Sequence, residues 1–297
     1  MKKTLFFLMM VGSVFCSCRA DLKDSDHDVV PDMATIYASI EADTDVRNVI
    51  DNTSFETSWL SGDAINVFFG ASESSYFVTS QSGPVAQFKG SIDVVTGGGE
   101  GLTDDTSLWG IYPYDAANTC DGKQVTLTLP HNQEPAENTF ANGLFPQIAR
   151  SFNFYMTFYN LCGCIRFTVA NPDIKCVTLS GNDNEPIAGK VSVSMPEKVP
   201  VVESVLSPES KLTMYAPDGG CFKPGVNYYF VLFPTTFSKG LTMTYYKEGA
   251  CASYSYTKSY TLARNKVSRF ADRDAGLTFE NIPLNGWGEG ENIGGEI

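Results

Sequence analysis

The sequence predicts an all-β fold of antiparallel sandwiches, and three observations lead to this expectation. After residue 33, apolar and small polar residues alternate with a period of two along most of the chain, as in strands with one buried face. Turn-forming clusters of Gly, Asn, Asp and Pro separate these runs. No stretch of a dozen residues presents an apolar helical face with capping residues. Many short strands with frequent turns favour sandwiches over a parallel α/β sheet.

The expected strands fall into two kinds. The alternating segments are 34–40, 125–129, 166–169, 190–194, 211–215, 241–245 and 254–262. Two continuous apolar runs, 65–69 and 228–233, are typical of strands buried on both faces. The main turns are expected at 61–63, 97–99, 181–184 and 217–220.

Composition and charge exclude several classes of protein. The chain has 297 residues, enough for about two domains of roughly 100–200 residues each. Hydrophobic residues make up 43% of it, which excludes a largely disordered chain. Its formal net charge is −13, so the basic footprint of a nucleic-acid-binding protein is absent and no nucleic-acid partner is expected. Only His27 and His131 could serve histidine-based catalysis or metal binding.

The N-terminal residues 1–18 resemble a bacterial lipoprotein signal peptide. A basic start precedes an apolar run, 5–15, which is shorter than the roughly 20 residues that a membrane span needs. Cys18 follows the small Ser17, so we expect palmitate-type lipidation at Cys18 and anchoring to the outer membrane. Cys16 is the competing position but follows the bulky Phe15, and an ordinary signal peptide is the alternative.

Four further segments follow. Residues 19–33 form an acidic tether; its aspartates resemble a calcium loop, but Val29 replaces the required glycine and Thr35 the final carboxylate, so no metal is expected. The body divides near residue 150 into an N-terminal sandwich, 34–150, and a C-terminal sandwich, 151–279. Residues 280–297 form a Gly-rich acidic tail.

Catalytic and cofactor motifs are missing from the sequence. It contains no nucleophile elbow, zinc helix, phosphate loop or dinucleotide fingerprint, so neither an enzyme nor a cofactor is expected. Cys162 and Cys164 lie on one face of a strand and are expected to be small buried hydrophobes. The six cysteines of the body demand no disulfide framework; they are Cys120, Cys162, Cys164, Cys176, Cys221 and Cys251.

Several motifs resemble the fimbrillin family of Bacteroidetes. The stretch from Trp59 to Phe69 resembles its Trp-x-x-Gly-Asp-x-Ile-x-Val-Phe signature, with Trp59 as a core anchor and Gly62-Asp63 as a turn. Further stretches agree in order: 88–90, 112–114, 125–130 with Gln133, 158–168, 177–181 with 188–191, and 229–234. The resemblance covers roughly residues 34 to 275.

This resemblance implies a fold and a function. The fold would be two tandem transthyretin-like Greek-key β-sandwiches. The protein would be a structural or adhesive subunit of a cell-surface fimbria or pilus, with other fimbrial subunits as partners and host, bacterial or glycan receptors as adhesion targets. The alternative is a monomeric surface glycan-binding lipoprotein of a nutrient-uptake system, with Tyr254, Tyr256 and Tyr260 as candidate sugar-stacking residues, although this spacing is more typical of core or cross-strand pairs.

The resemblance also implies proteolytic processing. In the family an arginine-specific protease removes the lipidated N-terminus together with the first strand. Arg47 follows the first expected strand within a polar segment, 43–48, where nicking concentrates. A cut at Arg19 would fall within the tether and would remove no strand. The alternative to processing is an uncut subunit, as expected for a fimbrial anchor.

Removal of the first strand would expose an edge that a strand from a neighbouring subunit could fill. In the resembled family a C-terminal segment is the usual donor, which implies segment 276–288 here, with Leu277, Phe279, Ile282, Leu284 and Trp287 as its apolar anchors. Pro283 lacks an amide hydrogen and weakens the case for one continuous strand. Alternatively, Leu277 and Phe279 complete the second domain's own sheet.

Overall fold

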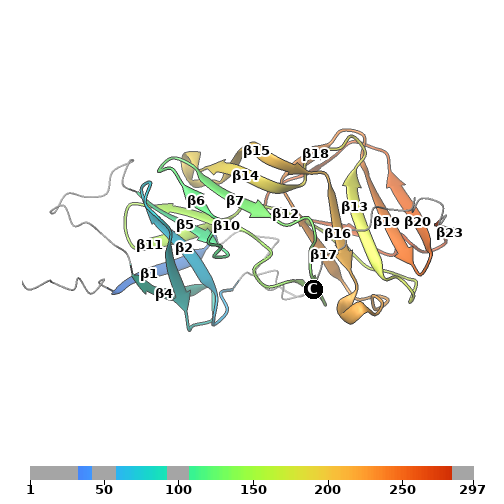
Figure 1. Cartoon of the computed structure of the whole chain (residues 1–297), viewed down its shortest axis with the longest axis horizontal. Coiled ribbons are helices and arrows are strands. Elements are labelled where there is room, and N and C mark those ends of the chain that lie inside the picture. Colours follow the sequence, from blue (N-terminus) through green and yellow to red (C-terminus); the bar gives the residue numbers. More distant parts are fainter. Residues whose placement is uncertain (1–32, 42–57, 92–106, 283–297) are drawn as a thin grey trace, which may run out of the picture. The chain divides into compact units, whose positions relative to one another are not determined.

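The computed structural model describes residues 33–41, 58–91 and 107–282 (Figure 1). Strands dominate these ranges, and their helical elements are two single 3-10 turns, η1 (Pro196–Lys198) and η2 (Pro217–Gly219). The prediction of an all-β fold is therefore confirmed. No helix in the described ranges is long and apolar enough to cross a membrane. Cys18, Arg47, Leu284 and Trp287 lie outside the described residues.

Seven strands form a closed barrel in the order β1-β11-β10-β5-β2-β3-β4. β1 closes it, because it pairs with β11 in parallel and with β4 in antiparallel orientation. The bounds are β1 Met33–Ile40, β2 Ala64–Phe69, β3 Ser75–Thr79, β4 Val85–Ser91, β5 Leu108–Tyr112, β10 Gln147–Ser151 and β11 Tyr155–Asn160.

Trp59 anchors the barrel interior, as its place in the motif predicts. Its side chain is fully buried, and its ring meets those of Phe88, Tyr112 and Phe158 edge-on at centroid distances of 4.9, 5.3 and 5.2 Å. Edge-to-face pairs at such distances add to the free energy gained by burying the rings. The barrel is therefore organised around one tryptophan.

The remaining strands build five further sheets, ordered β15-β14-β7-β6, β17-β12-β22, β16-β13-β19-β20-β23, β18-β21 and β8-β9. Their bounds are β6 Thr119–Cys120, β7 Val125–Leu129, β8 Pro135–Ala136, β9 Thr139–Phe140, β12 Gly163–Phe167, β13 Cys176–Gly181, β14 Ala188–Ser194, β15 Val201–Glu209, β16 Lys211–Tyr215, β17 Tyr228–Leu232, β18 Thr235–Phe237, β19 Leu241–Lys247, β20 Ala250–Tyr256, β21 Tyr260–Leu262, β22 Val267–Phe270 and β23 Glu280–Asn281.

Sheet membership does not follow the expected boundary at residue 150. β11 lies beyond residue 150 yet belongs to the barrel, where it pairs with β1 and β10. β7 lies before it yet pairs with β14 from Gly189↔Leu129 to Val193↔Val125. Alternation of apolar and polar residues identifies a strand but not the strand that it pairs with. The sequence pattern therefore did not reveal the pairings that cross residue 150. The two-domain division and the tandem transthyretin-like Greek-key topology stay predictions.

The 254–262 segment was expected as one strand, and this is wrong. The chain leaves the sheet after Tyr256 and starts β21 at Tyr260. β20 pairs with β19, whereas β21 pairs with β18. The tyrosines Tyr254, Tyr256 and Tyr260 are partly buried against the larger hydrophobic core, so they serve packing as their spacing suggested.

All six cysteines of the body are free thiols. Cys162 and Cys164 are fully buried, which confirms them as small core residues. Burial raises the pKa of the Cys162 thiol well above its ordinary value, so this side chain stays neutral and unreactive at physiological pH.

Candidate functional site

β1 is the first described strand and lies between two partners. Its backbone pairs with β4 from Met33↔Ser91 to Ser39↔Val85, and with β11 from Tyr37↔Tyr155 to Ile40↔Phe158. The sequence forms a strand here because apolar and small polar residues alternate, and this places every second side chain inside the barrel. We call the space that β1 fills between β4 and β11 the β1 groove.

Three side chains of β1 fill the groove. Ile36 and Ala38 are fully buried and Ile40 is 8% exposed. Burial of one isoleucine side chain contributes about 1.5–3 kcal/mol. The indole Nε1 of Trp59 donates a hydrogen bond of 3.1 Å to the carbonyl oxygen of Ala38. The groove therefore recognises both the side chains and the backbone of the strand.

Contacts on the outer face are weaker. The rings of Tyr37 and Tyr155 stack with their centroids 4.9 Å apart, and Tyr155 is 69% exposed. The hydroxyls of Ser39 and Thr157 form a hydrogen bond of 3.1 Å. These cross-strand pairs add a few tenths of a kcal/mol up to about 1 kcal/mol each, less than the buried face contributes.

An ion pair closes the C-terminal end of the groove. Arg264 donates from Nη1 to Glu41 Oε1 at 2.6 Å and from Nη2 to Oε2 at 3.0 Å, a bidentate arrangement. The backbone amide of Asn160 also donates to Glu41 Oε1 at 2.6 Å. The Glu41 side chain is 9% exposed and that of Arg264 is 23% exposed, so both charges are largely shielded from water.

Asp63 occupies the predicted turn before β2. Gly62 has φ +98°, which favours glycine. The buried carboxylate of Asp63 accepts the amide of Leu60 at 2.8 Å and the hydroxyl of Tyr112 at 3.1 Å. Burial raises the pKa of Asp63 above its ordinary value of 3.8, although both hydrogen bonds oppose the shift. Burial and the nearby Asp63 carboxylate raise the pKa of Tyr112.

The start of the expected donor segment lies on its own chain's sheet. Leu277 and Phe279 are partly buried against the larger core, and the Nζ of Lys247 lies 4.2 Å from the centre of the Phe279 ring. β23 pairs with β20 only at Ala250↔Asn281 and Cys251↔Glu280. Ile282 is 40% exposed, and its amide donates to Gly249 at 2.9 Å. This placement corresponds to the alternative in which the segment completes its own sheet.

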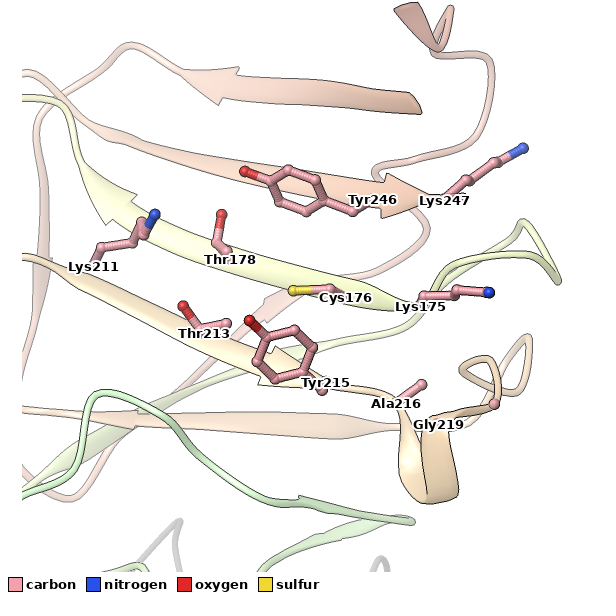
Figure 2. A pocket seen from close by; sticks show the side chains of 11 residues that line it. Lys175, Cys176, Thr178, Lys211, Thr213, Tyr215, Ala216, Gly219, Tyr246 and Lys247 are labelled. Atoms are coloured by element: carbon pink, nitrogen blue, oxygen red, sulfur yellow. The ribbon is translucent and has the colours of Figure 1, made fainter. Parts of the chain in front are cut away.

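A second concave surface lies on β16, β13 and β19, with a volume of about 520 Å³. We call it the tyrosine trough. Figure 2 shows Tyr215 and Tyr246 on either side of Cys176, in agreement with the pairings Cys176↔Tyr215 and Cys176↔Tyr246. Thr178 and Thr213 also line it, and lysines lie at both ends. The sequence did not reveal this surface, because its residues meet only through strand pairing.

The tyrosine trough holds no strong nucleophile. Burial raises the pKa of the Cys176 thiol to about 11, so the thiol is protonated at neutral pH. Lys175 pairs with Glu248 at 2.5 Å at one end. Aromatic side chains with neighbouring hydroxyls and cations can bind a sugar ring by stacking and hydrogen bonding. The residues that line the tyrosine trough supply these groups but no general base.

Catalytic and metal-binding arrangements do not emerge elsewhere in the described ranges. His131 is half exposed, and its Nδ1 lies 3.8 Å from the Glu209 carboxylate, a surface contact. No group of three or more potential metal ligands occurs within residues 33–41, 58–91 and 107–282. The candidate binding surfaces of the described residues therefore include the β1 groove and the tyrosine trough.

No family model and no curated protein matches the chain. Similar solved structures include a candidate cell adhesion protein from Bacteroides ovatus, with 15% identity, a TM-score of 0.49, and coverage of 85% of this chain and 96% of that one. Another, from Bacteroides uniformis, has 12% identity, a TM-score of 0.46, and coverage of 84% and 96%. The tip fimbrial protein Mfa3 from Porphyromonas gingivalis, with a C-terminal truncation, has 8% identity, a TM-score of 0.37, and coverage of 84% and 99%.

The two Bacteroides proteins are described as candidate cell adhesion proteins, and the Porphyromonas gingivalis protein is described as a tip fimbrial protein.

Proposed function

We propose that the chain is a structural or adhesive subunit of a cell-surface fimbria, exported as a lipoprotein and assembled by strand exchange after N-terminal processing. One observation carries this proposal: β1, the first described strand, fills a groove that pairs with it on both sides. A strand in this position can leave after a single cut and be replaced by another chain's strand.

Loss of β1 would leave a surface that cannot remain exposed. The edges of β4 and β11 would lose their backbone partners, and the core around Trp59 would lose Ile36 and Ile40. Unpaired strand edges next to apolar surface are templates for strand addition. Main-chain hydrogen bonds would supply affinity, and the pockets of Ile36, Ala38 and Ile40 would supply specificity.

Processing would begin from a lipidated precursor. Lipidation at Cys18 would hold the chain at the outer membrane until a cut after Arg47 releases both the anchor and β1. Export would thus keep the groove filled until the subunit reaches the cell surface. Cys18→Ala should mislocalise the precursor, and intact-mass analysis of the membrane fraction checks for the acylated N-terminus.

The donor would be segment 276–288 of a neighbouring subunit. In this chain β23 pairs with β20 at two positions, and Leu277 and Phe279 are partly buried against the larger core, so release of the segment would break these contacts. Leu277, Phe279, Ile282, Leu284 and Trp287 would be its apolar anchors on the partner. Other fimbrial subunits are the expected partners, and host, bacterial or glycan receptors the expected adhesion targets.

Deletion of residues 276–297 tests this assignment. The deleted chain should still fold, because the barrel contains none of these residues, and it should reach the surface without entering fibres. Electron microscopy of surface fibres and immunoblotting of sheared fibres measure incorporation. Normal incorporation of the truncated subunit would contradict the donor role.

The tyrosine trough favours a second candidate function, glycan binding by a monomeric surface lipoprotein. Tyr215 is 64% exposed and stands across Cys176 from Tyr246, a spacing in which a pyranose ring could stack. Binding of the mature protein to a glycan array should then fall when Tyr215 is replaced by alanine. Tyr76→Ala is the control, since Tyr76 is 49% exposed on the barrel. An unchanged array signal for Tyr215→Ala would contradict this candidate.

A further inference from the structure

We propose that the end of the β1 groove is a carboxylate-binding subsite, formed by Arg264 and the backbone amide of Asn160. It would select an incoming strand that carries an acidic residue where Glu41 now lies. This inference rests on the proposed strand exchange and specifies which strand the groove accepts.

Glu41 shows how a carboxylate is held there. Both of its oxygens accept from the Arg264 guanidinium, at 2.6 and 3.0 Å, and Oε1 also accepts the Asn160 amide at 2.6 Å. A planar guanidinium matches a carboxylate better than any neutral side chain does. Glu41 directly follows β1, so a cut after Arg47 would remove it together with the strand.

The subsite is held in place by groups other than β1. The Nη1 of Arg264 also donates to the carbonyl oxygen of Asn160 at 2.8 Å. The adjacent Asn265 donates its amide to Cys162 at 2.8 Å, and its side chain accepts from Asn160 Nδ2 at 2.8 Å. Gln147 Nε2 donates to Asn160 Oδ1 at 2.7 Å. Arg264 and Asn160 should therefore keep their positions when β1 leaves.

An incoming strand without a carboxylate at this position would cover the Arg264 guanidinium without giving it an ionic partner. Arg264 is already largely shielded, and a shielded cation that loses its partner is strongly unfavourable. One charge-assisted bidentate contact corresponds to about tenfold to a hundredfold in affinity. The subsite therefore discriminates against neutral strands as well as favouring acidic ones.

The required pattern is an apolar residue that points into the groove, followed directly by an acidic one, as in Ile40-Glu41. The expected donor segment contains this step at Phe279-Glu280. In this chain the Glu280 side chain is exposed, so its carboxylate is available to a partner. We therefore assign a second copy of this segment, with Glu280 on Arg264, as the occupant of the subsite. In this register Leu277 and Phe279 take the places of Ala38 and Ile40, and the later residues of the segment extend beyond the end of β1.

Peptide exchange into the cleaved full-length chain tests the subsite. The protein is cut after Arg47 by limited digestion with an arginine-specific protease, and a fluorescent peptide of residues 33–41 competes with the retained strand. The same peptide with Glu41→Gln should bind about tenfold to a hundredfold more weakly. A peptide of residues 276–288 should lose affinity similarly on Glu280→Gln.

A double-mutant cycle isolates the contact. In a cleaved Arg264→Gln chain, the difference in affinity between the unaltered 33–41 peptide and its Glu41→Gln variant should shrink to the part that the Asn160 amide contributes. Arg273→Gln is the matched control. It removes the same charged group, but the Arg273 guanidinium lies 5.0 Å from the centre of the Tyr254 ring on β20, which is not a barrel strand. If Arg264→Gln does not fold, the comparison of peptides on the unaltered chain still decides.

The outcomes separate the two proposals. If each peptide and its Glu→Gln variant bind the unaltered cleaved chain with equal affinity, the subsite is overturned and strand exchange still stands. Failure of every peptide to enter the cleaved chain would contradict strand exchange and the subsite with it. A preference for acidic peptides that is undiminished in Arg264→Gln would also overturn the assignment to Arg264.

Discussion

β1 and β23 lie at the two ends of the described chain and are attached in very different ways. β1 pairs on both sides, buries three side chains and ends at a bidentate ion pair. β23 pairs on one side at two positions, and the next residue, Ile282, is half exposed. A strand held like β1 needs a covalent cut and a competing strand before it leaves, whereas a strand held like β23 can separate spontaneously.

The largest effect is expected inside the β1 groove. Ile36→Ala removes a fully buried side chain from a closed barrel and should lower the free energy of unfolding by about 2–5 kcal/mol. Urea denaturation measures this loss. A loss below about 1 kcal/mol would indicate that β1 contributes little to the barrel.

Loss of the ion pair should have the next largest effect. Glu41→Gln leaves Arg264 without its charged partner and should cost about 1–3 kcal/mol. Hydrogen exchange at the amides of Tyr37 and Glu41, which donate to Phe154 and Phe158, should accelerate accordingly. Unchanged exchange at both amides would show that the ion pair does not hold the strand.

The barrel should also respond to pH through Asp63. The folded pKa of Asp63 is raised, so the folded state binds the proton more tightly than the unfolded state, and stability falls as pH rises from 3.8 through the raised value. The Asp63→Asn variant has no carboxyl to titrate at this position, so it does not lose stability in this way. Its free energy of unfolding relative to that of the unaltered protein should therefore rise as pH increases from 3.8 through the raised pKa.

Urea denaturation at several pH values measures the difference for Asp63→Asn. A difference that is constant with pH, or that falls as pH rises, would contradict the raised pKa. β23 carries no comparable buried carboxyl, so Glu280→Gln serves as a control without this dependence.

The smallest effect is expected directly after β23. Ile282→Ala truncates a half-exposed side chain at the sheet edge and should change stability by no more than about 0.5 kcal/mol. The amide of Ile282 should exchange much faster than that of Tyr37. Comparable protection at the two amides would remove the contrast between the strands.

The sequence predicted local features of the barrel well. Trp59 and Gly62-Asp63 occupy the expected core and turn positions. Of the inward face expected from Ile65, Val67 and Phe69, the first two are fully buried and Phe69 is partly buried. Motif spacing and strand alternation predict such features because they depend on near neighbours. Phe68 is buried as well, as a continuous apolar run predicts for a strand covered on both faces.

The sequence could not predict pairing between distant segments. Glu41 and Arg264 are 223 residues apart, and nothing in either local pattern indicates the other. The break between β20 and β21 was missed, because serine and threonine continue the alternation where the chain changes partner. The tyrosine trough was missed for the same reason, since Tyr215, Cys176 and Tyr246 come from three strands.

The most direct test of strand exchange is the N-terminus of the subunit within surface fibres. Fibres are sheared from cells and purified, and the mass and N-terminal sequence of this chain are determined. A chain that begins at Asn48 and lacks residues 33–41 is the predicted result. A chain in intact fibres that still begins at Cys18 and retains β1 would contradict the replacement of β1 by a neighbouring strand.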